Sequence, residues 1–278
     1  MNANLKHELK VFAAEIRIAL LEEMKDRGFG HIGGSLSICD LLAVLYGKVM
    51  NYKVEDPKWM DRDKLVCSKG HAGPAVYATL ALKGFFPYED LKTLNQPGTN
   101  FPSHCDRLKT PGVDMTTGSL GQGISLAVGM AVGDAIKGRK CRTFLMVGDG
   151  ELNEGQVWEA AMFAAAKKVN NLVWLIDWNK RQLDGALCDV LEPFNLEEKF
   201  RAFGFDACTV DGHDVEALHA ALTKPAEDRP IAIILDTVKG KGVTAVEQTA
   251  SNHSMNVSQD VFDSWLAELQ GKLAALNA

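Results

Sequence analysis

Apolar residues recur at helical spacing over the first part of the chain. They stand three or four positions apart and therefore fall on one face of a helix: Leu5, Leu9, Phe12, Ile16, Leu20 and Met24. Gly28 ends this pattern, as glycine commonly does at a helix terminus. The pattern predicts an amphipathic helix over residues 4–27.

Two further helices and a loop are predicted before residue 113. Ser37 followed by Asp40 resembles a capping box with aspartate in place of glutamate, so we expect a second helix to begin at Ser37. Residues 72–83 form a third helical pattern. Residues 95–112 are rich in proline and glycine and are typical of a loop.

The pattern then changes to short, continuous apolar runs with helical segments between them. The runs cover residues 142–147, 172–177, 205–210 and 231–236. Such runs favour strands that are buried on both faces of a parallel sheet. We therefore predict an α/β fold, with a parallel sheet flanked by helices and a helical N-terminal part, as a single domain over residues 1–278. A last helix is expected at about residues 258–275.

Composition and charge narrow the function classes. The 278 residues carry a formal net charge of −6, and no basic run is longer than two residues, which argues against nucleic-acid binding. No apolar stretch approaches the roughly 20 residues that cross a bilayer, and the N-terminus lacks a secretion-signal pattern. Six cysteines occur without C-x-x-C spacing, so neither a zinc ribbon nor a redox motif is indicated. We expect a soluble, cytoplasmic protein with no membrane partner.

Candidate metal ligands follow two neighbouring predicted strands. Asp149 lies in a Gly-Asp-Gly motif after one strand, and Asn179 follows the next, with 28 residues between Gly150 and Asn179. Strand ends of a parallel sheet face one crevice, so the carboxylate and the amide oxygen can converge there. Mg²⁺ takes one or two such oxygens together with phosphate oxygens. This spacing matches the signature of thiamine-diphosphate sites, whereas two ordinary turns are the alternative.

A glycine-rich segment precedes an Ala/Gly-rich helical pattern. Residues 116–123 read Thr-Thr-Gly-Ser-Leu-Gly-Gln-Gly. A loop of this kind can hold phosphate at a helix N-terminus. It is neither a Walker loop nor a Rossmann fingerprint, because the required lysine and glycine spacing are absent.

These motifs together resemble those of the transketolases. The glycine-rich segment is similar to the family's T-T-G-P-L-G-Q-G loop, with Ser119 in place of proline, as in many split transketolases. Four more segments resemble the family in its own order: residues 31–35, 68–72, 210–214 and 237–242. The resemblance covers nearly the whole chain and implies the N-terminal, thiamine-diphosphate-binding subunit of a split transketolase.

The resemblance implies a cofactor and a set of site residues. The cofactor is thiamine diphosphate with Mg²⁺, for which Ca²⁺ or Mn²⁺ can substitute. The implied metal ligands are Asp149, Asn179 and the backbone carbonyl of Arg181. The implied cofactor-binding residues are His71, Gly118, Leu120, Gly150, Asn179 and His253.

Four histidines are implied to face the substrate, because imidazoles exchange protons near neutral pH: His31, His71, His104 and His253. For His104 an exposed loop residue is the alternative, since its neighbours depart from the family pattern. His7 and His219 are expected at the surface, and His213 is expected to be structural.

The implied activity needs a second chain. With a partner, this chain is expected to transfer a two-carbon ketol unit from a ketose phosphate, or a related anionic sugar, to an aldose. The glutamate that activates the cofactor belongs to a middle domain in this family. We therefore expect a C-terminal transketolase subunit that supplies it, with two copies of each subunit. The alternative is a truncated chain, although the helical ending and polar tail favour a split enzyme.

One departure from the family concerns the substrate. Many fused transketolases bind the sugar phosphate through an arginine before the histidine equivalent to His104. Here Asn95 stands at that place, and no arginine occurs between Leu91 and Cys105. Arg107 is a possible replacement. A sulfonated or branched ketose is therefore an alternative donor.

Two other hypotheses remain open at this point. Another thiamine enzyme, such as a 1-deoxyxylulose-5-phosphate synthase or a 2-oxo acid dehydrogenase α chain, is less favoured, because the histidines and the glycine-rich loop indicate ketol transfer. A non-catalytic scaffold with the same fold is the non-enzyme alternative. Trp174 and Trp178 are expected to flank the metal site, so a fluorescence response to the cofactor would argue against the scaffold.

Overall fold

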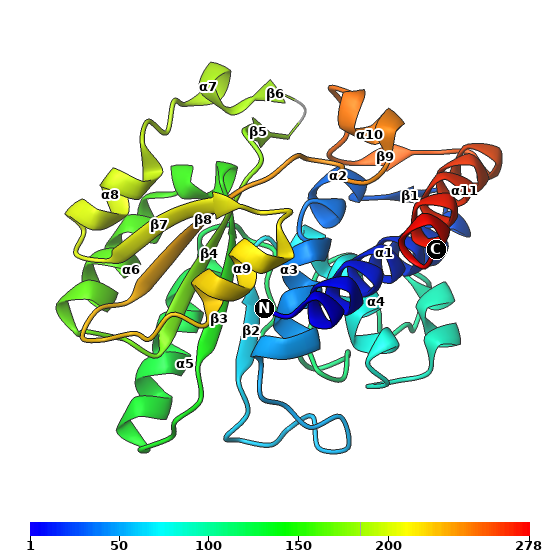
Figure 1. Cartoon of the computed structure of the whole chain (residues 1–278). Helices are drawn as coiled ribbons and strands as arrows, with labels where there is room; N and C mark the ends of the chain where they lie inside the picture. The colour runs from blue at the N-terminus through cyan, green and yellow to red at the C-terminus, as the bar shows by residue number, and fades with distance from the viewer. Residues whose placement is uncertain (184) are drawn as a thin grey trace.

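The computed structural model describes residues 1–183 and 185–278. It contains a five-stranded sheet in which all neighbouring strands are parallel, in the order β2-β3-β4-β8-β7 (Figure 1). The strands are β2 (Lys64–Cys67), β3 (Thr143–Gly148), β4 (Leu172–Trp178), β7 (Asp206–Asp211) and β8 (Ile231–Asp236). Because the strands run the same way, their carboxyl ends form one edge of the sheet, where a ligand site is expected.

Both faces of the sheet are buried. Along β4, Val173 and Leu175 pack into one hydrophobic cluster, whereas Trp174 and Ile176 pack into the other. The alternation follows from the two-residue period of a strand. It explains why the strands read as continuous apolar runs rather than as alternating ones.

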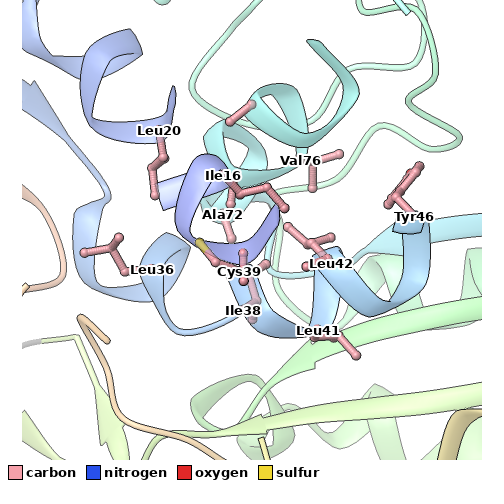
Figure 2. Packing of buried hydrophobic residues seen from close by; sticks show 14 of the residues in the cluster. Ile16, Leu20, Leu36, Ile38, Cys39, Leu41, Leu42, Tyr46, Ala72 and Val76 are labelled. Carbon is pink, nitrogen blue, oxygen red and sulfur yellow. The ribbon is translucent and has the colours of Figure 1, made fainter. Parts of the chain in front are cut away.

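Helices cover each face. One cluster includes residues of α1 (Ala3–Lys25), α2 (Ile32–Leu36), α3 (Cys39–Val44), α4 (Gly73–Leu82), α9 (Val215–Leu222), α10 (Thr244–Gln248) and α11 (Gln259–Leu276). The other includes residues of α5 (Gln122–Ile136), α6 (Gly155–Ala166) and α8 (Leu196–Ala202). Figure 2 shows Ile16 and Leu20 of α1, Leu42 of α3 and Val76 of α4 among the side chains of the first cluster.

Short elements complete the description. They are the π-helical turn η1 (Leu45–Val49), the 3₁₀ turns η2 (Gly70–Ala72), η3 (Tyr88–Thr93) and η4 (Gly150–Asn153), and the helix α7 (Leu187–Val190). Two small antiparallel pairs join β1 (Phe29–Gly30) to β9 (Met255–Asn256) and β5 (Arg181–Gln182) to β6 (Gly185–Ala186).

The predicted elements are confirmed, with two exceptions. The first helix, the helix at 72–83, the loop at 95–112, the four strands and the last helix lie within about two residues of their expected bounds. A helix begins close to the expected start, at Cys39, but the expected cap at Ser37 is wrong, because Ser37 lies at the end of α2 and the N-cap of α3 is Ile38. The apolar pattern also does not reveal β2, which has only four residues.

Tertiary partners explain the error at Ser37. Its hydroxyl donates to the Asp177 carboxylate at 2.8 Å. Asp40 forms a buried ion pair with Arg17 at 2.5 Å. Ser37 and Asp40, the two polar residues of the apparent capping box, therefore bond to residues far away in the chain rather than to the backbone of α3.

The segment Ile32–Val49 has the length and apolar composition of a membrane span, yet 83% of it is buried inside the protein. It is divided among α2, α3 and η1. We interpret it as a core segment.

Candidate functional site

A cavity of about 270 Å³ lies at the carboxyl edge of the sheet. Its walls come from the N-cap of α2, the turn η2 after β2, and the loops that follow β3, β4 and β8. Every candidate site residue named from the sequence lines it: His31, His71, His104, Gly118, Leu120, Asp149, Gly150, Asn179, Arg181 and His253. The fold thus brings together residues that are far apart in the chain.

Four imidazole rings form a cluster in this cavity. The ring centroid of His31 lies 5.6 Å from that of His71, 5.4 Å from that of His104 and 5.3 Å from that of His253. The rings of His71 and His253 are 4.8 Å apart. His104 therefore belongs to the cluster rather than to an exposed loop.

Burial favours the neutral form of three of these imidazoles, those of His31, His71 and His104. It lowers the pKa of His31, with smaller effects from His104 and Lys239, and it also lowers the pKa of His104. The pKa of His71 lies well below its ordinary value because of burial, then Lys69, then the neighbouring histidines. A neutral imidazole can accept a proton on one nitrogen and donate from the other, so the cluster is suited to moving protons between hydroxyl groups.

Asp149 lies directly after β3, at the carboxyl edge of the sheet. Its carboxylate accepts hydrogen bonds from the backbone N–H groups of Gly150 at 2.8 Å and Lys180 at 2.6 Å. The residue is 2% exposed. Burial, followed by the charge of Asp177, raises the pKa of Asp149 to about 7. A cation at this carboxylate would offset both effects.

Asn179 is held beside Asp149 by the end of β4. Its Nδ2 donates to the Asp177 carboxylate at 2.9 Å, and its Oδ1 accepts from the Arg181 N–H at 3.1 Å. The guanidinium of Arg181 instead donates to the carbonyl of Ala250 at 3.0 Å. The Arg181 side chain is thus engaged elsewhere, and its backbone carbonyl is the group that the resemblance implies as a metal ligand.

The glycine-rich loop approaches the histidines closely. Gly118 has φ +145°, and a Cβ there would lie 2.9 Å from Cδ2 of His104, so a side chain is excluded. The Glu151 carboxylate accepts from the Gly121 N–H at 2.8 Å, the Gly148 N–H at 3.2 Å and the Ser68 hydroxyl. Glu151 thereby connects the loop to the ends of β2 and β3.

Sequence reasoning gave no role to several other lining residues, namely Lys69, Glu151, Gln182, Leu183 and Lys239. Lys69 and Lys239 are 1% and 4% exposed. Lys239 donates to the carbonyl of Leu183 at 2.5 Å and lies 3.4 Å from Nδ1 of His253. Lys69 and Lys239 lie within residues 68–72 and 237–242, two of the segments that resemble the family. Nothing in the sequence indicates that either lysine is buried.

The donor set fits a metal–diphosphate group. Asp149 and Asn179 offer hard oxygen ligands, as Mg²⁺ prefers. The buried carboxylate of Asp149 has no cationic hydrogen-bond partner among the described residues. Lys239 adds a positive charge at the cavity wall, and the positive φ of Gly118 permits close backbone approach.

Four residues noted from the sequence do not line the cavity. His213 bonds to Asp40 and accepts from the Val238 N–H, which supports the structural interpretation. Arg107 is exposed and lines a separate cavity, so it does not replace the missing arginine within this chain's cavity. Trp174 is fully buried in the core, so the expectation that it flanks the metal site is wrong. Trp178, at the end of β4, lies next to Asp177 in the chain.

Comparison with known proteins agrees with this geometry. Residues 9–269 match the thiamine diphosphate-binding domain of transketolase. The chain is 47% identical to the 6-deoxy-6-sulfo-D-fructose transketolase subunit SqwG of Clostridium sp. (strain MSTE9), over 96% of each chain. It is 35% identical to an apulose-4-phosphate transketolase subunit of Actinobacillus succinogenes, over 95% of each.

Longer transketolases match over part of their length. Human transketolase is 37% identical over 95% of this chain and 43% of its own. The solved structure of transketolase from Leishmania mexicana has a TM-score of 0.84 and 29% identity, covering 97% of this chain and 46% of that one. The chain thus spans about half the length of these proteins. It belongs to the transketolase family and contains the family's thiamine diphosphate-binding domain.

Proposed function

We propose that this chain is the N-terminal subunit of a two-chain transketolase. With a C-terminal partner subunit, it transfers a two-carbon ketol unit from an anionic ketose to an aldose, using thiamine diphosphate and Mg²⁺. The observation that carries the proposal is the convergence of the four-histidine cluster with Asp149 and Asn179 in one cavity.

The part of the cavity lined by Asp149 and Asn179, called the metal end below, would hold the cofactor. Asp149, Asn179 and the carbonyl of Arg181 would bind Mg²⁺ through oxygen atoms, which this cation prefers. Gly150, His71 and His253 would contact the diphosphate, while Gly118 and Leu120 would line the cofactor near its pyrimidine ring. When bound, thiamine diphosphate supplies the reactive carbon that accepts the two-carbon unit.

The histidine cluster accepts and returns protons of the substrate's hydroxyl groups. His31, His71 and His104 are neutral near pH 7 because burial lowers the pKa of each. A neutral imidazole can take the proton of a sugar hydroxyl as the neighbouring C–C bond breaks. It can return that proton when the second sugar accepts the unit.

A separate partner subunit is part of the proposal. Two relatives that match along nearly their whole length are named as subunits. We propose that the partner supplies the glutamate that activates the cofactor, and that two copies of each subunit assemble.

A two-carbon transfer assay tests the assembly. This chain and its partner chain are supplied separately and together, with thiamine diphosphate, Mg²⁺, xylulose 5-phosphate and ribose 5-phosphate. The proposal predicts turnover only when both chains and the cofactor are present. Full activity of this chain alone, or production of CO₂ from pyruvate by the pair, would contradict it.

A sulfonated ketose is a second candidate donor. The relative at 47% identity is named for 6-deoxy-6-sulfo-D-fructose, and this chain has no arginine between Leu91 and Cys105. Asn95 occupies the position in question, and its Oδ1 accepts from the Ser103 hydroxyl at 2.7 Å. Unlike an arginine, this neutral amide offers no positive charge to a phosphate dianion.

Competition between donors tests this choice. The assembled enzyme is given 6-deoxy-6-sulfo-D-fructose and fructose 6-phosphate with the same aldose, and kcat/KM is measured for each. A preference for the sulfonate of about tenfold or more, equivalent to roughly 1.4 kcal/mol, supports the sulfonated donor. Equal values or a preference for the phosphate would remove it.

A further inference from the structure

A buried ion pair lies between the metal end of the cavity and the histidine cluster. Lys69 Nζ is 2.5 Å from Asp177 Oδ2, and the two side chains are 2% and 0% exposed. Lys69 follows β2, and Asp177 lies near the end of β4. A charge pair this deeply buried requires close geometry and additional hydrogen bonds to be stable.

The Asp177 carboxylate accepts hydrogen bonds from two other segments and from Asn179, two residues further along the chain. Ser37, after α2, donates to it at 2.8 Å, and Thr237, after β8, donates at 2.5 Å. Asn179 donates through Nδ2 at 2.9 Å. The backbone carbonyl of Asp177 also accepts from the Asp149 N–H at 3.2 Å. This one residue thus contacts both proposed side-chain ligands of the metal.

The Asp177 carboxylate and the Arg181 N–H together determine which way the Asn179 amide points. An ionised carboxylate only accepts hydrogen bonds, so the amide nitrogen must face Asp177. The carbonyl oxygen Oδ1 then lies on the opposite side of the amide group. Without Asp177 only the Arg181 N–H bond would hold the amide. Rotated orientations that present the NH₂ group to a cation, which is repulsive, would then become more populated.

Lys69 connects this arrangement to the histidines. Besides Asp177, its Nζ donates to the Gly34 carbonyl at 2.7 Å. Gly34 belongs to α2, which begins directly after His31, and a Cβ on Gly34 would lie 3.2 Å from Nε2 of His71. The Lys69 side chain therefore spans from the Asn179 support to the segment that carries His31.

We propose that Lys69 and Asp177 are positioning residues that keep the side-chain oxygen of Asn179 available as a metal ligand. This rests on the proposed metal site. Mg²⁺ demands near-ideal octahedral coordination, whereas Ca²⁺ accepts irregular geometry with longer bonds. Loss of the positioning pair therefore weakens Mg²⁺ binding more than Ca²⁺ binding.

The test replaces the pair by apolar residues of similar volume, Lys69→Met with Asp177→Leu. Removing both charges avoids a buried unpaired ion. The Ser37, Thr237 and Asn179 donors lose their acceptor, however, so the double variant is first checked for a folded state. The matched control is Lys64→Met with Asp134→Leu. Lys64 and Asp134 also form a buried pair, with an N–O distance of 2.7 Å and 6% exposure each, at the opposite end of β2 and about 16 Å along the chain from Lys69.

Calorimetry on the assembled enzyme measures the Kd of Mg²⁺ and of Ca²⁺ at saturating thiamine diphosphate. The Kd ratio of Mg²⁺ to Ca²⁺ should rise about tenfold or more in the Lys69/Asp177 double variant, since partners of metal ligands typically contribute roughly 10- to 100-fold in affinity. It should stay within about twofold of wild type in the Lys64/Asp134 variant. General structural damage would weaken both metals alike and leave the ratio unchanged.

A milder variant keeps the test decisive if the double variant does not fold. Thr237→Val removes one donor to Asp177 at nearly constant volume and should raise the same ratio about fivefold, which lies outside the twofold range allowed for the control. An unchanged ratio in a folded variant, with a wild type that binds both metals, would overturn the positioning role alone. A wild type that binds neither metal would instead overturn the proposed metal site together with this inference.

Discussion

At the scale of single residues, His71 gives the site a dependence on acid. Burial, Lys69 and the other histidines hold its pKa well below the ordinary value in the folded chain. When the pH falls below about 6.5, the unfolded chain gains a proton on this residue while the folded chain does not. The unfolded state is then favoured, so the site destabilises the protein in acid and has no such effect above about pH 7.

Urea denaturation of the cofactor-free chain measures this effect. Wild type should lose free energy of unfolding between about pH 7.5 and about pH 5.5, and His71→Gln should lose less over the same range. His7→Gln, at an exposed position of α1, is the control and should follow wild type. Equal losses in wild type and His71→Gln would contradict the account.

Asp149 should affect stability and binding in opposite directions. Burial and Asp177 raise its pKa to about 7, so the folded carboxyl keeps its proton up to about pH 7, whereas the unfolded one loses it near pH 4. Stability in the absence of metal therefore falls as the pH rises through this window. Asp149→Asn lacks the charge and should be more stable than wild type above pH 7, by at most about 4 kcal/mol.

The same substitution removes the carboxylate ligand. Mg²⁺ affinity at saturating thiamine diphosphate should fall by more than about 100-fold. Thermal unfolding with and without the cofactor and Mg²⁺ shows both effects in one experiment. Cofactor-dependent stabilisation that survives in Asp149→Asn would contradict its role as a metal ligand.

At the scale of elements, the glycine-rich loop must keep one residue without a side chain. Gly118 has φ +145°, and an added Cβ would contact the His104 ring. Gly118→Ala should therefore displace the ring or the loop and weaken cofactor binding by about 1–3 kcal/mol. Calorimetric titration with thiamine diphosphate measures this change.

Gly271→Ala provides the control in α11. No atom lies within 4 Å of an added Cβ there, and alanine favours a helix interior. This variant should leave cofactor binding unchanged and increase stability by up to about 1 kcal/mol. Unchanged binding in Gly118→Ala as well would show that the loop tolerates a side chain.

Elements and motifs were predictable to different extents. β3, β4 and β8 are buried on both faces, and their continuous apolar runs follow directly from that burial. β2 escaped prediction because its four residues include a buried lysine. The capping box expected at Ser37 and Asp40 is wrong because both residues have distant partners, which no local pattern encodes.

The site also contains residues that the sequence identified and residues that it did not. Asp149 and Asn179 were recognisable because each follows a strand at a characteristic spacing. Lys69, Asp177 and Glu151 were not, since their importance lies in contacts between segments that only the folded chain brings together. Supporting residues carry no chemical signature of their own in a sequence.

At the scale of the whole molecule, the described part of the cavity lacks an available activating carboxylate. Asp149 and Glu151 line it. Asp149 is the proposed metal ligand, and both oxygens of Glu151 accept hydrogen bonds from Ser68 and the loop backbone. A glutamate from a partner chain fits this arrangement, and it explains why activity should require both chains.

The central claim is that the assembled cavity moves two carbons from a ketose to an aldose. An anionic ketose labelled with ¹³C at carbons 1 and 2 is incubated with an unlabelled aldose, both subunits, thiamine diphosphate and Mg²⁺, and the products are followed by mass spectrometry. The account predicts that both labelled carbons appear together on the aldose, and that Asp149→Asn abolishes the transfer. Label released as CO₂, or label that stays on the donor while the cofactor is bound, would contradict it.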